Sequence, residues 1–287
     1  MDHKAKGLFL VLLMSVVWAI LIILSKAILN KGVPVFTYLF QMICLAAVLV
    51  SLYAFLFHRD KIVAPNRSQV KYLIMIGATG TALANIIGYY GLESSSSINY
   101  GFLVKTTVVF TVILAHFMLK EVLDFHKILL VIMLLVGVYL ITTEGRELIP
   151  NRYDILIVMS AFFYAFANNL SKIVLRNFDP AVLSMYRMIF GSVLLAVFVI
   201  AVQKEFYVVQ YPLEIALASL HMAMLMILIY RTLRITSVSY LSMMSMSTPV
   251  IVTILGVVFL NEHFSLIQAL GGILIILSGV FIHLKNI

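Results

Sequence analysis

The chain has 287 residues, of which 63% are hydrophobic and only 11% are charged, and its formal net charge is +8. Soluble domains average roughly 45–50% apolar and 25% charged residues, so this composition excludes an ordinary soluble globular protein. With a mean hydropathy of +1.11, the chain is predicted to be an all-α integral membrane protein.

Ten stretches are apolar and long enough to approach the roughly 20 residues that a membrane-spanning helix needs. They lie at 8–28, 34–57, 70–92, 98–119, 126–143, 154–175, 180–202, 212–231, 237–260 and 265–284. Continuous apolar runs favour helices over the alternating strands of a barrel. The first run ends in Ser25-Lys26 without a small-residue cleavage pattern, so we expect a retained helix. Cys44 is the only cysteine, so no intrachain disulfide can form.

The basic residues follow the predicted topology. If the N-terminus is cytoplasmic, thirteen basic residues fall in inside segments and five fall in outside turns, namely Lys26, Lys31, Arg146, Arg152 and Lys204. The positive-inside rule then predicts a multi-pass protein of the plasma or inner membrane with both termini cytoplasmic. The positive charge therefore predicts contact with a lipid bilayer and not with nucleic acid.

The sequence repeats itself. LSKAILNKGVPVFTYLFQMI (24–43) lies on LSKIVLRNFDPAVLSMYRMI (170–189) at a shift of 146 residues, with seven of the 20 positions identical. At a shift of 141, Leu92, Ser96 and Glu121 fall on Leu233, Ser237 and Glu262. These landmarks predict an internal duplication, with repeats at 1–146 and 147–287. Each repeat has five predicted spans, an odd number, so the two repeats are expected to be inverted in the membrane.

Further landmarks give the chain a resemblance to a known family. An aromatic residue lies seven positions before Ser-Lys in each half, Trp18 and Tyr164, and SMSTPVIVTILGVVFLNE occupies 245–262. With the two repeats, these features resemble the EamA family of the drug/metabolite transporter superfamily. The resemblance implies a ten-helix exporter of small metabolites, often amino acids. The first half departs from the pattern, with Gln41 at the position of Arg187 and Val108 at the position of Pro249.

Two cations lie inside predicted spans, Lys105 and Arg187. A charge at the centre of a bilayer costs about 2.5 kcal/mol or more, so each should face water, a partner or a charged ligand. We hypothesise that Lys105 replaces the arginine missing at Gln41, that the Gln41 and Lys105 side chains converge, and that both cations line one cavity. The alternatives are that Lys105 snorkels to the headgroups and that Arg187 binds carbonyls at a helix end of the facing repeat.

The other candidate substrate-binding residues are Trp18, Tyr164, Asn85, Asn168 and His221. The two aromatic residues lie too deep for an interfacial belt and could form a cavity wall or pack in the core. The asparagines and His221 could bind a substrate or join neighbouring helices by hydrogen bonds. Because adjacent helical residues point about 100° apart, at most one of Asn168 and its neighbour Asn169 should face a cavity.

Two features predict helix geometry. Gly80, Ala84 and Gly88 recur every four residues, which gives the third helix a small-residue face for close packing. Pro249 removes a backbone hydrogen bond inside the ninth span, so a kink is expected there.

The predicted function is secondary transport, with export of a small carboxylate-bearing metabolite such as an amino acid. The chain has no phosphate-binding loop and no metal-site motif, so no cofactor, no metal and no enzymatic activity are expected. The alternatives are a membrane enzyme acting on lipid-linked substrates and a receptor or scaffold that does not transport. The sequence is compatible with both a monomer and a homodimer.

Overall fold

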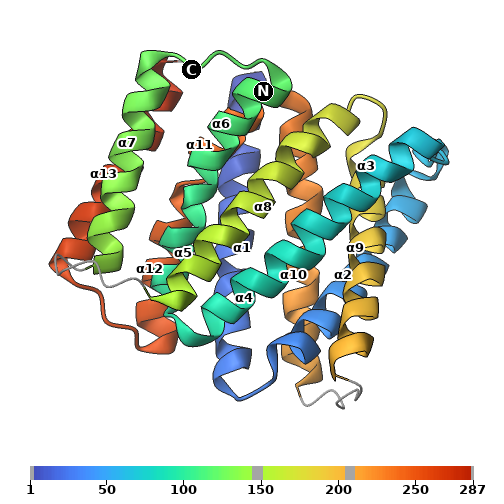
Figure 1. The fold of residues 1–287 in the computed structure, drawn as a ribbon, viewed down its shortest axis with the longest axis horizontal. Coiled ribbons are helices and arrows are strands. Elements are labelled where there is room, and N and C mark those ends of the chain that lie inside the picture. The colour runs from blue at the N-terminus through green and yellow to red at the C-terminus, as the bar shows by residue number, and fades with distance from the viewer. Residues whose placement is uncertain (1–2, 144–150, 204–210, 286–287) are drawn as a thin grey trace.

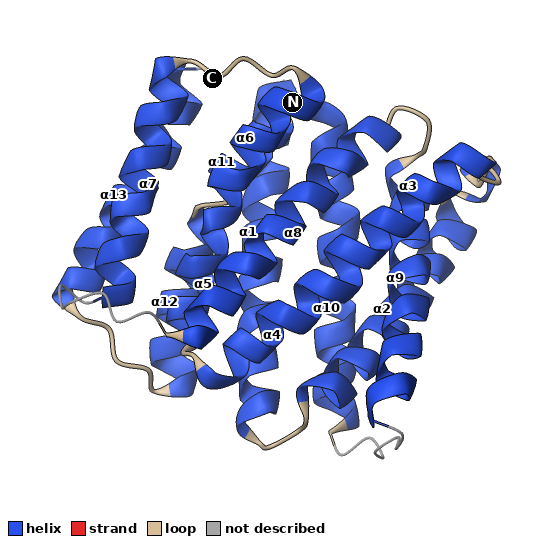
Figure 2. Ribbon diagram, viewed as in Figure 1, coloured by secondary structure: helices blue, strands red, loops and turns tan. Residues whose placement is uncertain are grey.

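The computed structural model describes residues 3–143, 151–203 and 211–285. Within these ranges the chain consists of helices and short loops, without strands (Figure 2). The predicted all-α class is therefore confirmed for the described residues. The predicted repeat boundary at 146/147, Arg146 and Lys204 lie outside the described residues.

The helices of each half appear in the same order. The first half contains α1 (His3–Asn30), α2 (Val35–Phe57), η1 (Arg59–Lys61), α3 (Arg67–Gly77), η2 (Ala78–Leu83), α4 (Ala84–Ser94), α5 (Ser97–Leu103), η3 (Val104–Thr106), α6 (Thr107–Leu119) and α7 (Phe125–Thr143). The second half contains α8 (Arg152–Val174), α9 (Pro180–Gln203), α10 (Pro212–Ile235), α11 (Val238–Met244), α12 (Ser247–Leu260) and α13 (Leu266–Lys285).

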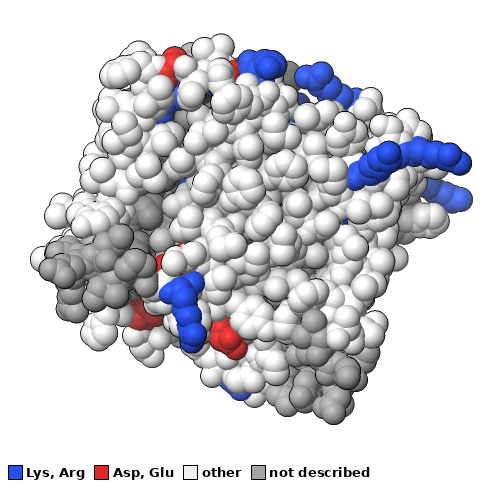
Figure 3. All heavy atoms as spheres, in the orientation of Figure 1, with Lys and Arg blue, Asp and Glu red and all other residues white. Residues whose placement is uncertain are grey.

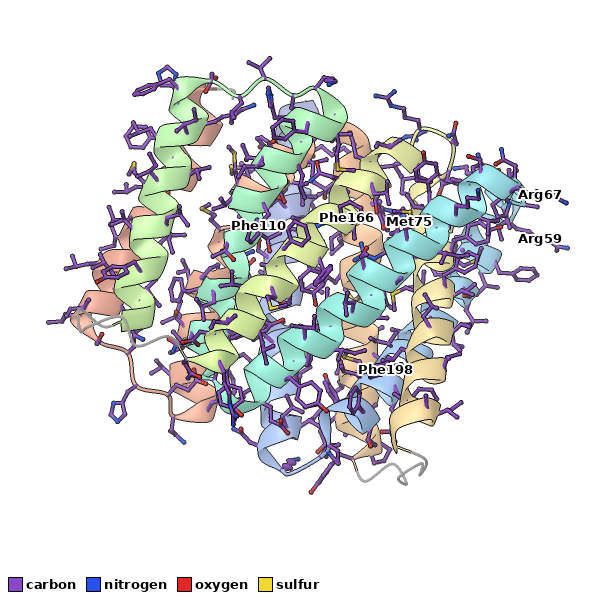
Figure 4. The ribbon with its side chains drawn as sticks, in the orientation of Figure 1. Arg59, Arg67, Met75, Phe110, Phe166 and Phe198 are labelled. Carbon is purple, nitrogen blue, oxygen red and sulfur yellow. The ribbon has the colours of Figure 1, made fainter. Side chains whose placement is uncertain are left out.

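Eight continuous helical stretches are long and apolar enough to cross a membrane. They are Ala5–Asn30, Val35–Phe57, Arg67–Ser94, Ser97–Leu119, Arg152–Val174, Pro180–Ala201, Pro212–Ile235 and Val238–Leu260. The fifth and tenth predicted spans correspond to shorter apolar helices, Phe125–Ile141 and Leu266–Ser278. The chain is thus a multi-pass membrane protein, and the total of ten spans remains a prediction. The visible face is mostly uncharged, with the charged residues gathered toward its margins (Figure 3). Arg59 and Arg67 lie at such a margin, whereas Phe110 and Phe166 lie on the face between the margins (Figure 4).

The helices form a bundle with a helix pair at each end. α7 packs on α13 at one end, α2 packs on α9 at the other, and the remaining helices lie between them (Figure 1). The packing is matched between the halves: α1 lies against α10 and α12, and its equivalent α8 lies against α4 and α6. α5 contacts α12 just as α11 contacts α6. Equivalent helices therefore occupy equivalent environments, as a duplicated chain should.

The small residues of the third span provide the close packing that was expected of them. A Cβ atom on Gly80 would lie 2.4 Å from the Cβ of Ala167, and one on Gly88 would lie 2.9 Å from Oγ of Ser160. Both neighbours belong to α8, which packs along α4 and η2. The absence of side chains at these glycines lets the backbone of α4 approach α8.

The fourth helix of each repeat is broken, although its sequence predicts one continuous span. The first breaks at η3, between α5 and α6, and the second breaks at Ser245, between α11 and α12. Pro249 cannot donate to the carbonyl of Ser245, which accounts for the second break close to the predicted kink. The first break has Val108 at the position of Pro249, so proline is not needed for it.

Hydroxyl groups accompany both breaks. Thr107 Oγ1 donates to the Val104 carbonyl, and its equivalent Thr248 donates from Oγ1 to the Ser245 carbonyl at 2.8 Å. Such side-chain hydrogen bonds compete with the helical backbone pattern. A hydropathy profile does not register them, which is why the first break, which has no proline, was not predicted.

Candidate functional site: a cavity between two broken helices

A central cavity lies where the broken helices meet the first helix of each repeat. Its lining is largely apolar and aromatic with a few polar groups: Met14, Trp18, Leu21, Asn85, Tyr89, Tyr100, Lys105, Thr107, Val108, Tyr164, Asn168, Arg187, Met222, Leu225, Met226, Ile229, Leu241, Ser242 and Ser245. The space open to the centres of water-sized molecules is about 50 Å³, which is room for a few waters. A metabolite would require its walls to move apart.

Six of the eight predicted site residues line this cavity. They are Lys105, Arg187, Trp18, Tyr164, Asn168 and Asn85. The two intramembrane cations, 82 positions apart in the sequence, therefore border one space, as hypothesised. The lining contains no aspartate or glutamate, so the formal charge of the wall is positive.

Lys105 lies in η3 and reaches across to the break in the other repeat. Its Nζ donates to Ser245 Oγ at 3.0 Å and to Thr248 Oγ1 at 3.2 Å, and it lies 4.2 Å from the centre of the Trp18 ring. The residue is only 1% exposed, so its ammonium does not extend to the protein surface as a snorkelling lysine would. Neutral hydroxyls and an aromatic face stabilise the charge but leave it uncompensated by an anion.

Arg187 is bound much more completely. Its Nε donates to Thr81 Oγ1 at 3.1 Å and its Nη2 donates to the Gly80 carbonyl at 2.9 Å. Its Nη1 donates to Asn168 Oδ1 at 3.3 Å and to Tyr230 Oη at 3.1 Å. Gly80 and Thr81 belong to η2, a π-helical turn within the third span of the other repeat. Arg187 thus binds a carbonyl of the facing repeat, as the structural alternative holds, but this carbonyl lies within the third span and not at a helix end.

The predicted amide and aromatic residues form a second polar chain along the wall. Tyr164 Oη donates to Asn85 Oδ1 at 2.9 Å, and Asn85 Nδ2 donates to the Thr81 carbonyl at 2.8 Å. Asn168 lines the cavity, whereas Asn169 donates to the Ala165 carbonyl at 2.9 Å and is absent from the lining. One of the two adjacent asparagines faces the cavity, in agreement with helical geometry.

Gln41 and His221 are not among the residues that line this cavity. His221 Nδ1 lies 2.8 Å from the Leu217 carbonyl oxygen of its own helix, so this contact is neither to a ligand nor to a neighbouring helix. At the repeat shift of 141, Gly80 corresponds to His221. Arg187 contacts Gly80 across the repeats. The residues equivalent to this pair are Gln41, in place of Arg187, and His221, in place of Gly80. The hypothesis that Gln41 converges on Lys105 finds no support in the cavity lining.

The sequence did not single out several lining residues, including Tyr89, Tyr100, Ser242 and Ser245. A signal existed for Tyr89, because Tyr89 and Tyr230 are equivalent at the shift of 141. Each approaches the serine of a repeated Ser-Lys pair: Ser25 Oγ donates to Tyr89 Oη at 3.3 Å, and Ser171 Oγ lies 2.9 Å from Tyr230 Oη. The repeated serines therefore help to position these two tyrosines.

The repeated lysines have an equally matched role outside the cavity. Lys26 Nζ donates to the carbonyls of Leu92 and Glu93 at 3.1 and 2.9 Å. Lys172 Nζ donates to the Leu233 carbonyl and, at 2.7 Å, to the Thr236 carbonyl. In each repeat the lysine thus ties the end of the first helix to the end of the third. Carbonyls at a helix end have few or no partners within the helix, so the lysines supply donors to them.

Comparison with known proteins agrees with these matched halves. The EamA-like transporter family matches residues 5–143 and, a second time, residues 151–284. The chain belongs to the EamA-like transporter family. Its two family segments contain the two sets of matched contacts, including both Ser-Lys pairs and both broken helices.

Related EamA-type chains carry transporter names. An "Uncharacterized transporter" of Methanothermobacter thermautotrophicus is 23% identical over 224 residues, which is 76% of this chain and 65% of that relative. The "Uncharacterized transporter YoaV" of Bacillus subtilis is 26% identical over 155 residues, 52% of each protein. The matches thus span less than two thirds of either relative. Both relatives are named as transporters, which agrees with the family to which this chain belongs.

A solved crystal structure shares the fold. It superposes with a TM-score of 0.72 at 17% sequence identity, over 99% of this chain and 98% of the other. At this identity the likeness concerns the fold alone.

Proposed function

We propose that this EamA-family chain is a secondary transporter that exports a small metabolite bearing one carboxylate, such as an amino acid. The two repeats form ten membrane spans with inverted topology and alternate access to the central cavity. The antiparallel course of the two broken helices supports inversion: the start of α11 lies beside the end of α6, and the start of α5 lies beside the end of α12. Broken helices at mid-membrane are a common setting for transporter substrate sites.

The observation that carries the proposal is Lys105. Its ammonium lies in the cavity wall, bonded to two hydroxyls and facing an aromatic ring, with no acid in the cavity lining. A carboxylate that displaced Ser245 or Thr248 from Nζ would exchange a neutral acceptor for a charged one. Charge-assisted hydrogen bonds are about twice as strong as neutral ones. Lys105 can therefore recognise an anion as a point charge.

Arg187 limits the number of anionic groups that the cavity can recognise. All three of its side-chain nitrogens already donate to protein acceptors. Binding a second carboxylate there would require breaking that network. One available cation fits a monocarboxylate better than a dicarboxylate. The amide oxygens of Asn85 and Asn168 each accept one hydrogen bond, from Tyr164 and from Arg187. Because an amide oxygen has two lone pairs, each can accept a second from an amino or hydroxyl group of the same substrate.

Counterflow of labelled substrates into proteoliposomes tests the proposal. Wild type should show saturable exchange of amino acids, with weaker exchange of dicarboxylates and of the corresponding decarboxylated amines. Lys105→Met should reduce exchange by at least about tenfold, the effect of losing one charge-assisted hydrogen bond. Lys61→Met, which removes an exposed lysine paired with Asp179, is the matched control and should keep wild-type exchange.

Three results would contradict parts of this proposal. Undiminished exchange by a folded Lys105→Met protein would remove the lysine from substrate recognition. Equal exchange of mono- and dicarboxylates would refute the single-anion preference. Saturable binding of an amino acid without any flux across the vesicle membrane would favour a receptor over a transporter.

A further inference from the structure

Glu121 makes a contact between the repeats, away from the cavity. It follows Lys120, which ends α6 in the left-handed conformation at φ 60°. Its Oε1 accepts a hydrogen bond from the backbone N–H of Val238 at 3.3 Å, and its Oε2 accepts one from Ser239 Oγ at 2.5 Å. The first turn of α11 is thereby bonded to the end of α6, although the two segments lie more than a hundred residues apart in the sequence.

Glu262 makes the equivalent contact in the reverse direction. It follows Asn261, which ends α12 at φ 53°. Its Oε1 accepts from the backbone N–H of Ser97 at 2.6 Å, and its Oε2 accepts from Ser97 Oγ at 2.9 Å and from the N–H of Ile98 at 3.0 Å. The shift of 141 residues relates both the glutamates and the residues they bind. A matched pair of this kind is a property of the duplicated fold.

The backbone at each helix end positions these carboxylates. The N–H of Glu121 donates to the Ala115 carbonyl and that of Glu262 donates to the Gly256 carbonyl, both at 3.2 Å. The left-handed residue before each glutamate turns the chain back toward the other repeat. Each carboxylate then accepts charge-assisted hydrogen bonds, which are the stronger class.

The two contacts lie at opposite ends of the pair of broken helices that borders the cavity. The broken helices run antiparallel, with Lys105 and Ser245 joined near their middle. Glu121 joins the pair at one end and Glu262 joins it at the other. The segments they hold are the first turns of α5 and α11, and the middle residues of these two helices, Tyr100 and Leu241, line the cavity wall. Moving one first turn away would therefore open the cavity at one end only.

We propose that Glu121 and Glu262 are two alternating latches, each of which closes one end of the cavity and is released when that end opens. The inference rests on the proposed alternating access. It assigns the opening of each end of the cavity to one of the two glutamates. With both latches formed and a cavity of only about 50 Å³ for the centres of water-sized molecules, the structure corresponds to a closed state. The two latches differ in strength, with two accepted bonds at Glu121 and three at Glu262.

Because Cys44 is the only cysteine, a Cys44→Ser background allows a single reporter thiol. Ser242→Cys is nearly isosteric and places the thiol in the cavity wall. A membrane-impermeant maleimide is then applied to intact cells and to inside-out vesicles, and the labelling rates from the two sides are compared. This measurement needs no knowledge of the substrate.

Glu121→Gln should raise labelling from the side on which Glu121 lies, on the order of tenfold for a lost charge-assisted hydrogen bond, and lower it from the other side. Glu262→Gln should do the reverse. On the topology predicted from the basic residues, Glu121 lies on the cytoplasmic side and Glu262 lies on the external side. Glu214→Gln, which disrupts an exposed ion pair with Lys31, is the matched control and should leave both rates unchanged.

If a glutamine variant does not fold, Ser239→Ala and Ser97→Ala each remove one hydroxyl partner of a latch and should give smaller shifts in the same opposite directions. Equal changes from both sides, or no change in folded variants, would overturn the latches and make the glutamates static helix caps. Opposite shifts in a protein that exchanges no substrate would retain the latches and refute the proposed transport. Substrate exchange without such shifts would refute the latches alone.

Discussion

At the residue scale, two buried cations that look alike in the sequence differ in their surroundings. Lys105 and Arg187 both interrupt apolar spans, and each is 1% exposed. Arg187 donates to four acceptors from three helical elements, whereas Lys105 donates to two hydroxyls and faces Trp18. Arg187 therefore joins three helical elements, and Lys105 is the cation that a ligand would bind under the proposed function.

The arginine network predicts a stability difference between the two cations. Arg187→Met should destabilise the protein by roughly 2–3 kcal/mol, because four buried acceptors lose their donor and membrane-protein hydrogen bonds average about 0.6 kcal/mol each, with further cost for groups left unpaired. Thermal unfolding in detergent micelles measures this as a lower midpoint temperature. Lys105→Met is the comparison and should lower the midpoint less. Equal midpoints for the two variants would contradict the division of roles.

At the scale of elements, helix positions followed from the sequence better than helix interruptions did. The predicted spans at 34–57 and 180–202 differ from α2 and α9 by one residue at most. The spans at 98–119 and 237–260 have the right limits but contain breaks at η3 and Ser245. Hydropathy measures side-chain transfer and is the same for a straight and a broken apolar helix. The breaks depend on hydroxyls such as Thr107 and Thr248.

The α7–α13 pair offers a test of close packing with a control one residue away. A Cβ on Gly271 would lie 2.6 Å from the Gly137 carbonyl oxygen, whereas one on Gly272 would meet nothing closer than Phe102 Cζ at 3.6 Å. Gly271→Ala should therefore destabilise the protein by about 1–3 kcal/mol through overpacking. Gly272→Ala should be neutral or stabilising by up to about 1 kcal/mol, because alanine favours the helix. Unfolding midpoints in detergent compare the two, and equal stability would refute the close contact.

At the scale of the whole molecule, the duplication organises the contacts. The serines, lysines and glutamates that align in the sequence make matched hydrogen bonds in the two halves. The contacts between the halves are reciprocal, since the glutamate of each repeat binds the other repeat. The departure at Gln41 and Lys105 is local, which leaves one half with an arginine in its second helix and the other with a lysine in its fourth.

Inversion of the repeats predicts that equivalent positions lie on opposite sides of the membrane. Lys31 and Asn177 are equivalent at the shift of 146 and both are exposed. In a Cys44→Ser background, Lys31→Cys should react with an impermeant maleimide on intact cells, and Asn177→Cys should react only after permeabilisation. This pattern follows from the positive-inside rule and an odd number of spans in each repeat. Labelling of both from the same side would refute inversion.

Hydropathy, charge spacing and repeated landmarks are properties of the linear chain, and they determined the membrane class, most helix limits, the duplication and six residues of the cavity wall. The tertiary structure alone decided that Arg187 binds four acceptors and Lys105 two, because these acceptors come from helices that are distant in the sequence. It also decided that Glu121 and Glu262 bind across the repeats, since the sequence shows their register but not their partners. Gln41 and His221 were polar and central in the sequence, yet the packing of α2 and α10 leaves both outside the cavity lining.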